Sequence, residues 1–312
     1  MPKCTLCYKN DAIFMRHYSG ERLCEKCFKG SIEDKVRITI AKYKMFDQDD
    51  KIAVAVSGGK DSISLLYILA DIEKKFPRTS IFAITVDEGI KGYRDEALRF
   101  AAKSCRELGI KHKIVSFKEM YRITLDELAD VIRGKEKNEL SPCSYCGVLR
   151  RCALNTATRQ IGANKLATAH NLDDETQTIL LNIIHGDVTR IARVKPVLDR
   201  GHSKLIQRVK PFCEVPEREI ALYAYLKKIE FQSIPCPYSE TAMRNDMRNM
   251  LNMMEEKHAG TKFAIFRSIE RIRPALEIAA KKEKIRDCKL CGEPTVSEVC
   301  QPCQMLQKLH II

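Results

Sequence analysis

The stretch Ser57-Gly58-Gly59-Lys60-Asp61-Ser62 decides the fold. It follows a continuous apolar run, residues 52–56, of the kind found in strands buried on both faces of a parallel sheet. Helical spacing of apolar residues begins directly after it, over residues 63–73. A glycine-rich turn between such a strand and a helix presents backbone amides to an anion, aided by the helix dipole. The stretch therefore predicts a phosphate-binding loop, to which Lys60 adds a positive charge.

The loop differs from the two common nucleotide-binding loops. A Walker A loop needs glycine where Val54 stands and serine or threonine where Asp61 stands. The dinucleotide fingerprint needs a third glycine, which is missing.

Apolar runs and helical stretches alternate from about residue 51 to residue 228. Further strands are predicted at residues 81–86, 112–116, 165–169 and 205–209, with a second helix over residues 93–108. Alternating strands and helices predict an α/β fold, a doubly wound parallel sheet with right-handed crossovers. Ligands of such sheets bind at the carboxyl ends of the strands.

The composition indicates a globular protein with a basic surface. Its 312 residues are 45% hydrophobic, and 54 Lys+Arg against 41 Asp+Glu give a formal net charge of +13. The charge favours a polyanionic partner, most simply nucleic acid, over a generally basic surface without a partner. No apolar run approaches the ~20 residues of a transmembrane helix. The N-terminus lacks the layout of a signal peptide, so we expect a cytoplasmic protein without a membrane partner.

Fourteen cysteines without an export signal indicate metal binding or catalysis, because the cytosol keeps thiols reduced. Eight of them form two C-x2-C quartets, one at each end of the chain: Cys4, Cys7, Cys24 and Cys27, and Cys288, Cys291, Cys300 and Cys303. Two such pairs complete a closed tetrahedral site, the geometry that structural zinc prefers. We therefore predict two Zn²⁺ ions, whose binding would supply the folding free energy of these short segments.

A third pair, Cys143 and Cys146, has no second pair nearby. Cys236 lies between Pro235 and Pro237, on a rigid loop that suits a ligand better than a core residue. Three thiolates from two loops suit a [4Fe–4S] cluster with one iron left open. A zinc site with an unnoticed fourth ligand and a redox-active cysteine pair are the alternatives. The remaining cysteines lie in apolar patterns and are predicted to be packing residues: Cys105, Cys152 and Cys213.

These features together resemble the TtuA/TtcA family of PP-loop tRNA 2-thiolation enzymes. The resemblance is carried by the 57–62 loop, by residues 166–176 (LATAHNLDDET), by the three odd cysteines and by the terminal quartets. It covers essentially the whole chain. It implies an enzyme that binds ATP with Mg²⁺, adenylates the C2 oxygen of a tRNA pyrimidine and then replaces that oxygen with sulfur.

The resemblance further implies that Cys143, Cys146 and Cys236 hold a [4Fe–4S] cluster whose free iron carries sulfide. It implies that the terminal zinc ribbons help to hold tRNA and that the protein is a homodimer. The sulfur donor, either sulfide or a thiocarboxylated ubiquitin-like carrier protein, stays open. So does the modified uridine, at position 34 or 54.

The predicted catalytic residues are Lys60, Asp174 and Arg150. Lys60 would stabilise the transferring phosphoryl group. Asp174, at the carboxyl edge of the sheet, is assigned to Mg²⁺ or to substrate protons, with a helix-terminal carboxylate as the alternative. In relatives a basic residue at the Arg150 position is implicated in catalysis. An arginine cannot readily deprotonate, so its role would be charge stabilisation.

The predicted ATP and Mg²⁺ site adds residues at the ends of three strands. For Asp87 a strand-terminating turn is the alternative, and for His170 an ordinary place at a strand end. The full predicted set is Ala55, Ser57, Gly58, Gly59, Lys60, Asp61, Ser62, Asp87, Ala169, His170 and Asp174.

Four segments follow from these assignments. Residues 1–30 form an N-terminal zinc ribbon, and 31–230 the PP-loop ATP pyrophosphatase domain. Residues 231–284 form a helical basic extension that contributes one cluster cysteine and includes a helix over 242–256. Residues 285–312 form the C-terminal ribbon. The predicted function is an ATP-dependent tRNA 2-thiouridine synthetase. The alternatives are a PP-loop ligase or amidotransferase of different chemistry and a non-catalytic RNA-binding subunit.

Overall fold

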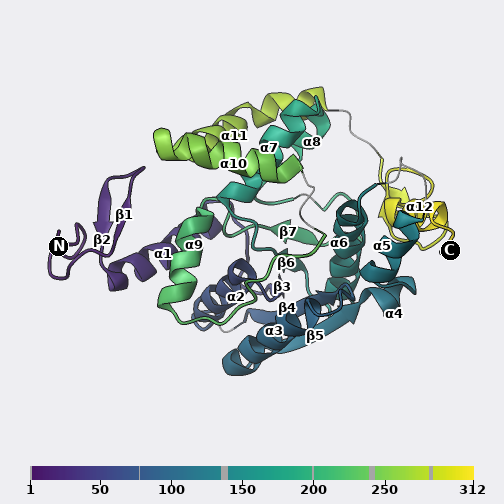
Figure 1. Cartoon of the computed structure of the whole chain (residues 1–312), viewed down its shortest axis with the longest axis horizontal. Coiled ribbons are helices and arrows are strands. Elements are labelled where there is room, and N and C mark those ends of the chain that lie inside the picture. Colours follow the sequence, from purple (N-terminus) through teal and green to yellow (C-terminus); the bar gives the residue numbers. More distant parts are fainter. Residues whose placement is uncertain (1, 77, 135–139, 199, 239–242, 281–283) are drawn as a thin grey trace.

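A five-stranded parallel sheet lies at the centre of the protein (Figure 1). The computed structural model describes residues 2–76, 78–134, 140–198, 200–238, 243–280 and 284–312. The strands run in the order β5-β4-β3-β6-β7. They are β3 (Lys51–Ala55), β4 (Ser80–Asp87), β5 (Lys111–Ser116), β6 (Lys165–Ala167) and β7 (Gln207–Val209). The chain winds outward from β3 first on one side and then on the other, so the predicted doubly wound sheet is confirmed.

Helices cover both faces of this sheet. α2 (Lys60–Glu73) packs against β3 and β4, and α3 (Arg94–Leu108) packs against β4 and β5. On the other face α6 (Pro142–Gln160) packs against β4, β5 and β6. The alternation of side chains along β3 separates two cores: Ile52 and Val54 belong to the α2 side and Ala53 to the α6 side. The loop after β3 thus emerges at the centre of the sheet, where the strand order reverses.

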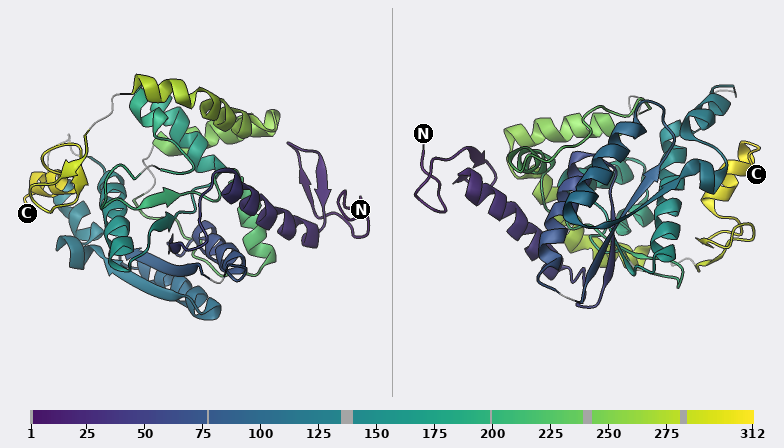
Figure 2. Two further views of the ribbon diagram at one scale, coloured as in Figure 1. Left: turned by 180° about the vertical axis from the view of Figure 1, so that it is seen from behind. Right: turned by 90° about the horizontal axis from the view of Figure 1, so that it is seen from below.

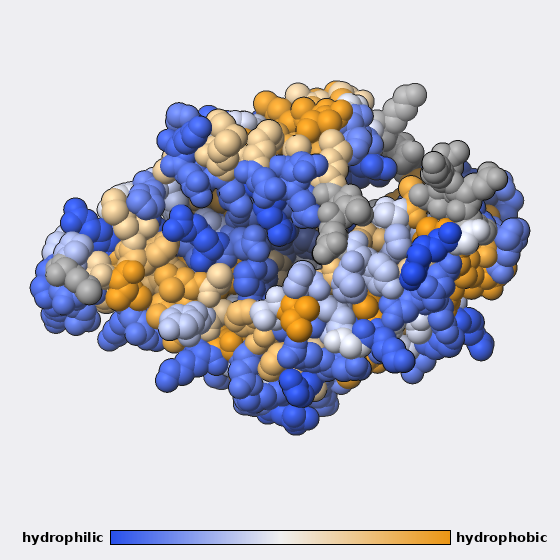
Figure 3. Space-filling view, viewed as in Figure 1, coloured by the Kyte–Doolittle hydropathy of each residue, from blue (hydrophilic) through white to orange (hydrophobic). Residues whose placement is uncertain are grey.

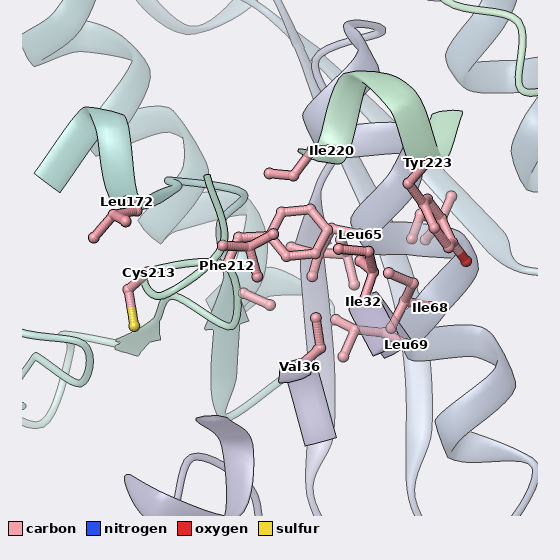
Figure 4. Close-up of a cluster of buried hydrophobic side chains, with 14 of the residues drawn as sticks. Ile32, Val36, Leu65, Ile68, Leu69, Leu172, Phe212, Cys213, Ile220 and Tyr223 are labelled. Carbon is pink, nitrogen blue, oxygen red and sulfur yellow. The ribbon is translucent and has the colours of Figure 1, made fainter. Parts of the chain in front are cut away.

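Further helices pack on the core on the α2 side of the sheet. α1 (Glu25–Lys42) and α9 (Glu217–Leu226) both contact this core, in which Val36, Leu65 and Ile220 lie close together (Figure 4). α7 (Leu172–Ile184) and α8 (Val188–Ala192) pack against α10 (Met243–Lys257) and α11 (Thr261–Ala279). The start of the predicted 242–256 helix, residue 242, lies outside the described residues.

The two cysteine quartets lie at opposite ends of the molecule (Figures 1 and 2). The N-terminal quartet lies around the hairpin of β1 (Phe14–Arg16) and β2 (Glu21–Leu23), and α1 runs from it into the core. The C-terminal quartet lies in a segment that forms β8 (Arg286–Asp287), β9 (Pro294–Thr295) and α12 (Gln301–Lys308). α12 packs on α6. Two short helices complete the described elements: α4 (Phe117–Tyr121) and α5 (Leu125–Arg133).

Both terminal segments are tied to the core by buried or half-buried ion pairs. Arg16 in β1 contacts Glu219 in α9 at 2.8 Å, and both side chains are nearly inaccessible to water. Arg159 in α6 pairs with Glu293 in the C-terminal segment. The four predicted segment boundaries stay a prediction, although α1 runs without a break across the one at residue 30. In the described part of the chain no helix has the length and apolar character to cross a membrane.

Candidate active site and metal centres

The predicted phosphate loop connects β3 to α2 at the carboxyl edge of the sheet. Gly58 adopts φ +91°, and a Cβ at this position would lie 2.3 Å from the carbonyl oxygen of Ala97, so only glycine fits. Ser62 Oγ accepts from the amide of Ser57 at 3.0 Å and fixes the turn. Among the described residues no side chain caps α2 at Gly59. The amides of its first turn are therefore available to an anion.

Lys60 lies between two carboxylates at the start of α2. Its Nζ is 2.7 Å from Glu217 Oε1 and 3.0 Å from Asp61 Oδ2. Burial alone would lower the pKa of Lys60, but these two carboxylates outweigh it and raise the pKa. Lys60 is thus a firmly charged cation beside the loop amides.

Asp61 has an unsatisfied oxygen at this site. Burial, with the nearby charges of Glu217 and Asp174, raises the pKa of Asp61 to about 6, although Lys60 opposes the shift. Its Oδ1 is buried and has no hydrogen-bond partner. A buried carboxylate oxygen without a partner, near further carboxylates and a phosphate-binding loop, fits Mg²⁺, which binds one or two carboxylates together with substrate phosphates.

Asp174 lies in the first turn of α7 and forms a capping box with Asn171, the N-cap residue. Its amide donates to Asn171 Oδ1 at 3.0 Å, and its Oδ2 accepts from the Asn171 amide at 3.2 Å. Arg244 Nη1 in α10 is 3.8 Å from Oδ1. Burial, with Glu217 and Asp173, raises the pKa of Asp174 against the opposing effects of the Asn171 amide and Arg244. Asp174 therefore caps a helix and also shares the electrostatic environment of Asp61.

The remaining predicted nucleotide residues lie at the ends of β3, β4 and β6. Ala55 ends β3 and is half-buried. Asp87 Oδ1 accepts from the Gly89 amide at 2.9 Å, which is the strand-terminating turn foreseen as its alternative. Ala169 packs on the α2 core. His170 Nδ1 contacts Thr168 Oγ1 at 2.9 Å.

Several cations lie near His170. The imidazole is exposed, yet the surrounding protein, together with Lys210, Arg244, Arg208 and Arg150, lowers its pKa, so the ring is neutral at pH 7. Figure 3 shows a hollow with hydrophilic residues around it beneath α10. This arrangement suits a polyanionic ligand.

The three odd cysteines lie near one another at the N-terminus of α6. Cys143 and Cys146 occupy its first turn, after Ser141, whose side chain caps the helix. Cys143 Sγ donates to the carbonyl of Tyr238, two residues beyond Cys236. Cys236 also packs against the α6-side core that contains Cys146. Burial and the neighbouring Cys236 raise the pKa of Cys143.

The spacing of these cysteines fits a cluster better than a single ion. The two terminal quartets have all four sulfurs within 4.8 Å of one another, whereas the described residues 143, 146 and 236 form no such group. Thiolates of a [4Fe–4S] cluster bind separate irons and so lie farther apart than the ligands of one ion. Together with the half-buried setting, this three-thiol set fits a cluster.

Arg150 lies one helical turn after Cys146 and points back at it. Its Nη2 donates to Cys146 Sγ at 2.9 Å, and its Nε is 3.1 Å from Glu88 Oε1. Arg151 does not make this contact, so the structure distinguishes the two arginines. A cation at this distance stabilises negative charge on the sulfur.

The terminal quartets have the geometry of closed metal sites. Cys7 Sγ and Cys24 Sγ are 3.8 Å apart, close to the edge of a tetrahedron with metal–sulfur bonds of about 2.3 Å. Backbone amides outweigh burial and lower the pKa of Cys4 to about 6; the same holds for Cys288 in the other quartet. Each quartet can therefore hold one metal ion.

Three site residues escaped the sequence analysis. Glu217 binds Lys60, and Glu88 joins Arg150 to the loop after β4. The backbone amide of Gln232 donates to the carbonyl of Gly58 at 3.0 Å. This bond places the segment before Cys236 against the phosphate loop. Glu88 follows Asp87 at the end of a predicted strand, which is a usable signal; the other two have none.

Comparison with known proteins agrees with this geometry. A family model described as a PP-loop domain matches residues 31–255. The chain is 37% identical to "Cytoplasmic tRNA 2-thiolation protein 1" of Chlamydomonas reinhardtii, covering 98% of this chain and 85% of that protein. It is 36% identical to the "tRNA-5-methyluridine(54) 2-sulfurtransferase" of Pyrococcus horikoshii, covering 97% and 93%. The solved U34-tRNA thiolase NcsA from Methanococcus maripaludis with its [4Fe–4S] cluster is 35% identical, with a TM-score of 0.84 over 99% and 97% of the two chains.

Proposed function

Because the chain belongs to the PP-loop family of tRNA 2-thiolation enzymes, we propose that it is an ATP-dependent tRNA 2-thiouridine synthetase. One observation carries this function. The chain segment that carries Cys236 contacts the phosphate loop: the backbone amide of Gln232, four residues before Cys236, donates to the carbonyl of Gly58 at 3.0 Å. An adenylated base formed at the loop would then lie near the segment that carries Cys236.

In the first half-reaction the C2 oxygen of the uridine attacks the α-phosphorus of ATP. The new O–P bond forms as pyrophosphate leaves. The amides at the start of α2 and the charged Lys60 would stabilise the negative charge on the phosphates. Asp61 and Asp174 are the proposed ligands of Mg²⁺, which when bound would neutralise the leaving pyrophosphate.

In the second half-reaction sulfur attacks C2 and AMP leaves. Cys143, Cys146 and Cys236 are the proposed ligands of the [4Fe–4S] cluster, which when bound would offer one iron without a protein ligand for sulfur delivery. Arg150 cannot act as a base here; it holds a positive charge against Cys146 Sγ. The half-buried setting limits competition from water, which would hydrolyse the adenylate.

The proposal extends to partners and metals. The tRNA would bind through the basic surface, and each terminal quartet would hold Zn²⁺ as a structural ion. A homodimer, a cytoplasmic location and a sulfur donor that is either sulfide or a thiocarboxylated ubiquitin-like carrier protein complete it.

The test is thiolation in vitro. Protein purified without oxygen is incubated with ATP, Mg²⁺, sulfide and unmodified tRNA, and nuclease fragments are analysed by mass spectrometry. We expect one 2-thiouridine per tRNA, at position 34 or 54, and one AMP released per sulfur incorporated. Omitting ATP, or replacing it with an analogue that cannot release pyrophosphate, should abolish the product. Unthiolated tRNA from protein with its full iron content would contradict the proposal.

A further inference from the structure

Glu88 lies between the nucleotide loop and the cysteine set. It directly follows β4, and its side chain is almost wholly buried at 6% exposure. Each carboxylate oxygen contacts a different arginine: Oε2 is 2.8 Å from Arg94 Nε, and Oε1 is 3.1 Å from Arg150 Nε. One buried carboxylate therefore joins α3 to α6.

Of the two arginines that contact Glu88, Arg94 is held rigidly. Arg94 is 5% exposed, and its Nη1 and Nη2 donate to the carbonyls of Ser57 and Val86 at 2.8 and 2.6 Å. The two terminal nitrogens of the guanidinium thus bind backbone carbonyls, and its Nε forms an ion pair with Glu88 without a hydrogen bond. This arginine already supplies Glu88 with the counter-charge that a buried carboxylate needs.

Arg150 is held differently. Its side chain is 46% exposed and could extend into water, but its Nε faces Glu88 and its Nη2 faces Cys146 Sγ. Because a guanidinium is planar, fixing Nε to Glu88 also fixes the direction of Nη2. Glu88 is therefore the group that turns Arg150 toward the thiolate.

We propose that Glu88 is a positioning residue, which holds the Arg150 guanidinium against Cys146 and thereby sets the charge at the cluster. This inference rests on the proposed function, since it assumes the cluster at Cys146. Arg94, clamped to the backbone, serves as the fixed anchor. Partners of metal ligands typically change metal-site activity by about 10–100-fold when they are removed.

The test uses Glu88→Gln in the cluster-loaded protein and measures the midpoint potential of the cluster by anaerobic titration. Loss of the Glu88 charge alone would make reduction easier and raise the potential. Loss of the Arg150 hydrogen bond to the thiolate would lower it, because hydrogen bonds to sulfur favour the reduced cluster. We expect the potential to fall, as in Arg150→Gln. In the double variant the potential should not fall below that of Arg150→Gln alone, because Glu88 lowers the potential only through Arg150.

Kinetics give a second readout. Arg94 keeps its bonds to Ser57 and Val86 in Glu88→Gln, so the KM for ATP should stay unchanged while kcat for thiolation falls about 10–100-fold. Glu96→Gln, on α3 and paired with Arg99 one turn along the same helix, is the matched control and should change neither quantity. A raised or unchanged potential, or an effect confined to the KM for ATP, would overturn the inference.

Two safeguards keep the test decisive. If Glu88→Gln does not fold, the test uses Arg150→Lys. Its ammonium keeps the charge but lacks the planar fork that reaches both Glu88 and Cys146, so the midpoint potential should again fall. An unchanged potential would refute the positioning role. If the unmodified protein loads no cluster, the proposed function fails. If it loads the cluster and thiolates tRNA while the potential of Glu88→Gln stays constant, only this inference fails.

Discussion

At the scale of the residue, the nucleotide site depends on a balance of charges around Lys60. Asp61 and Glu217 together hold its ammonium group, and Asp61 keeps one buried oxygen without a partner. Such an arrangement is costly in an empty site and favourable once phosphates and a divalent cation are present. The site is therefore preorganised for an anionic substrate bound with a metal ion.

Replacing Lys60 by glutamine should remove the charge while keeping the length of the side chain. We expect kcat/KM for AMP formation to fall about 10²–10³-fold, since one fixed donor to the transferring phosphoryl is lost. Iron content should not change. Lys74→Gln, at the other end of α2 and on the surface, is the matched control. Equal activity of the two variants would remove Lys60 from the mechanism.

His112 in β5 should make stability depend on pH. Its Nε2 lies 2.7 Å from Thr85 Oγ1, and burial lowers the pKa of this histidine below its usual value. The unfolded chain then binds the proton more readily, so stability is lost as the pH falls below about 6.5. Between pH 7.5 and 5.5 the wild-type Tm should fall more than that of His112→Gln, by roughly one to a few degrees. Parallel Tm curves would show that His112 contributes nothing.

At the scale of the element, the sequence predicts strands and loop better than the contacts between them. Residues 52–56 and 81–86 are apolar because both faces of the sheet are covered, so their pattern reveals buried strands. The phosphate loop is recognisable because Gly58 tolerates no side chain. Glu217 and Gln232 could not be foreseen, since they reach the loop through tertiary packing from more than 150 positions away.

The cap of α7 illustrates how an element places a site residue. In Asn171→Ala the amide of Asp174 loses its acceptor. We expect a loss of about 1 kcal/mol in stability and, because Asp174 is less firmly placed, a fall in thiolation rate on the order of tenfold. Ser116→Ala removes the corresponding cap of α4, away from the site, and should cost similar stability without the loss of rate. Equal rates in both variants would show that α7 does not position Asp174 for catalysis.

At the scale of the whole molecule, the sequence gives the net positive charge but does not show where the charged side chains lie on the surface. The net charge of +13 could reside anywhere, yet several cations lie near His170. Many cations are engaged within the protein, as Lys210 is by Glu175 and Arg273 by Glu270. Cations without such partners are free to bind phosphates.

Binding of tRNA should therefore depend steeply on salt. Each phosphate contact contributes about 0.7–0.9 to the slope of log K against log salt concentration. Arg248 in α10 is exposed, and we expect Arg248→Gln to reduce the slope by about 1. Arg99→Gln on α3, which lies on the opposite side of the molecule from α10 in Figure 1, should leave the slope unchanged. Fluorescence anisotropy from 50 to 300 mM KCl measures both; a flat dependence would argue against a phosphate-tracking surface.

The proposed chemistry depends most on the assignment of eleven cysteines to three metal centres. The direct measurement is iron, acid-labile sulfide and zinc per chain in protein purified without oxygen. We expect about four iron, four sulfide and two zinc, with iron lost in Cys236→Ser and retained in Cys152→Ser, whose cysteine lies on α6 beyond the cluster set. Three zinc and no iron in protein never exposed to air would contradict the cluster and the sulfur chemistry built on it.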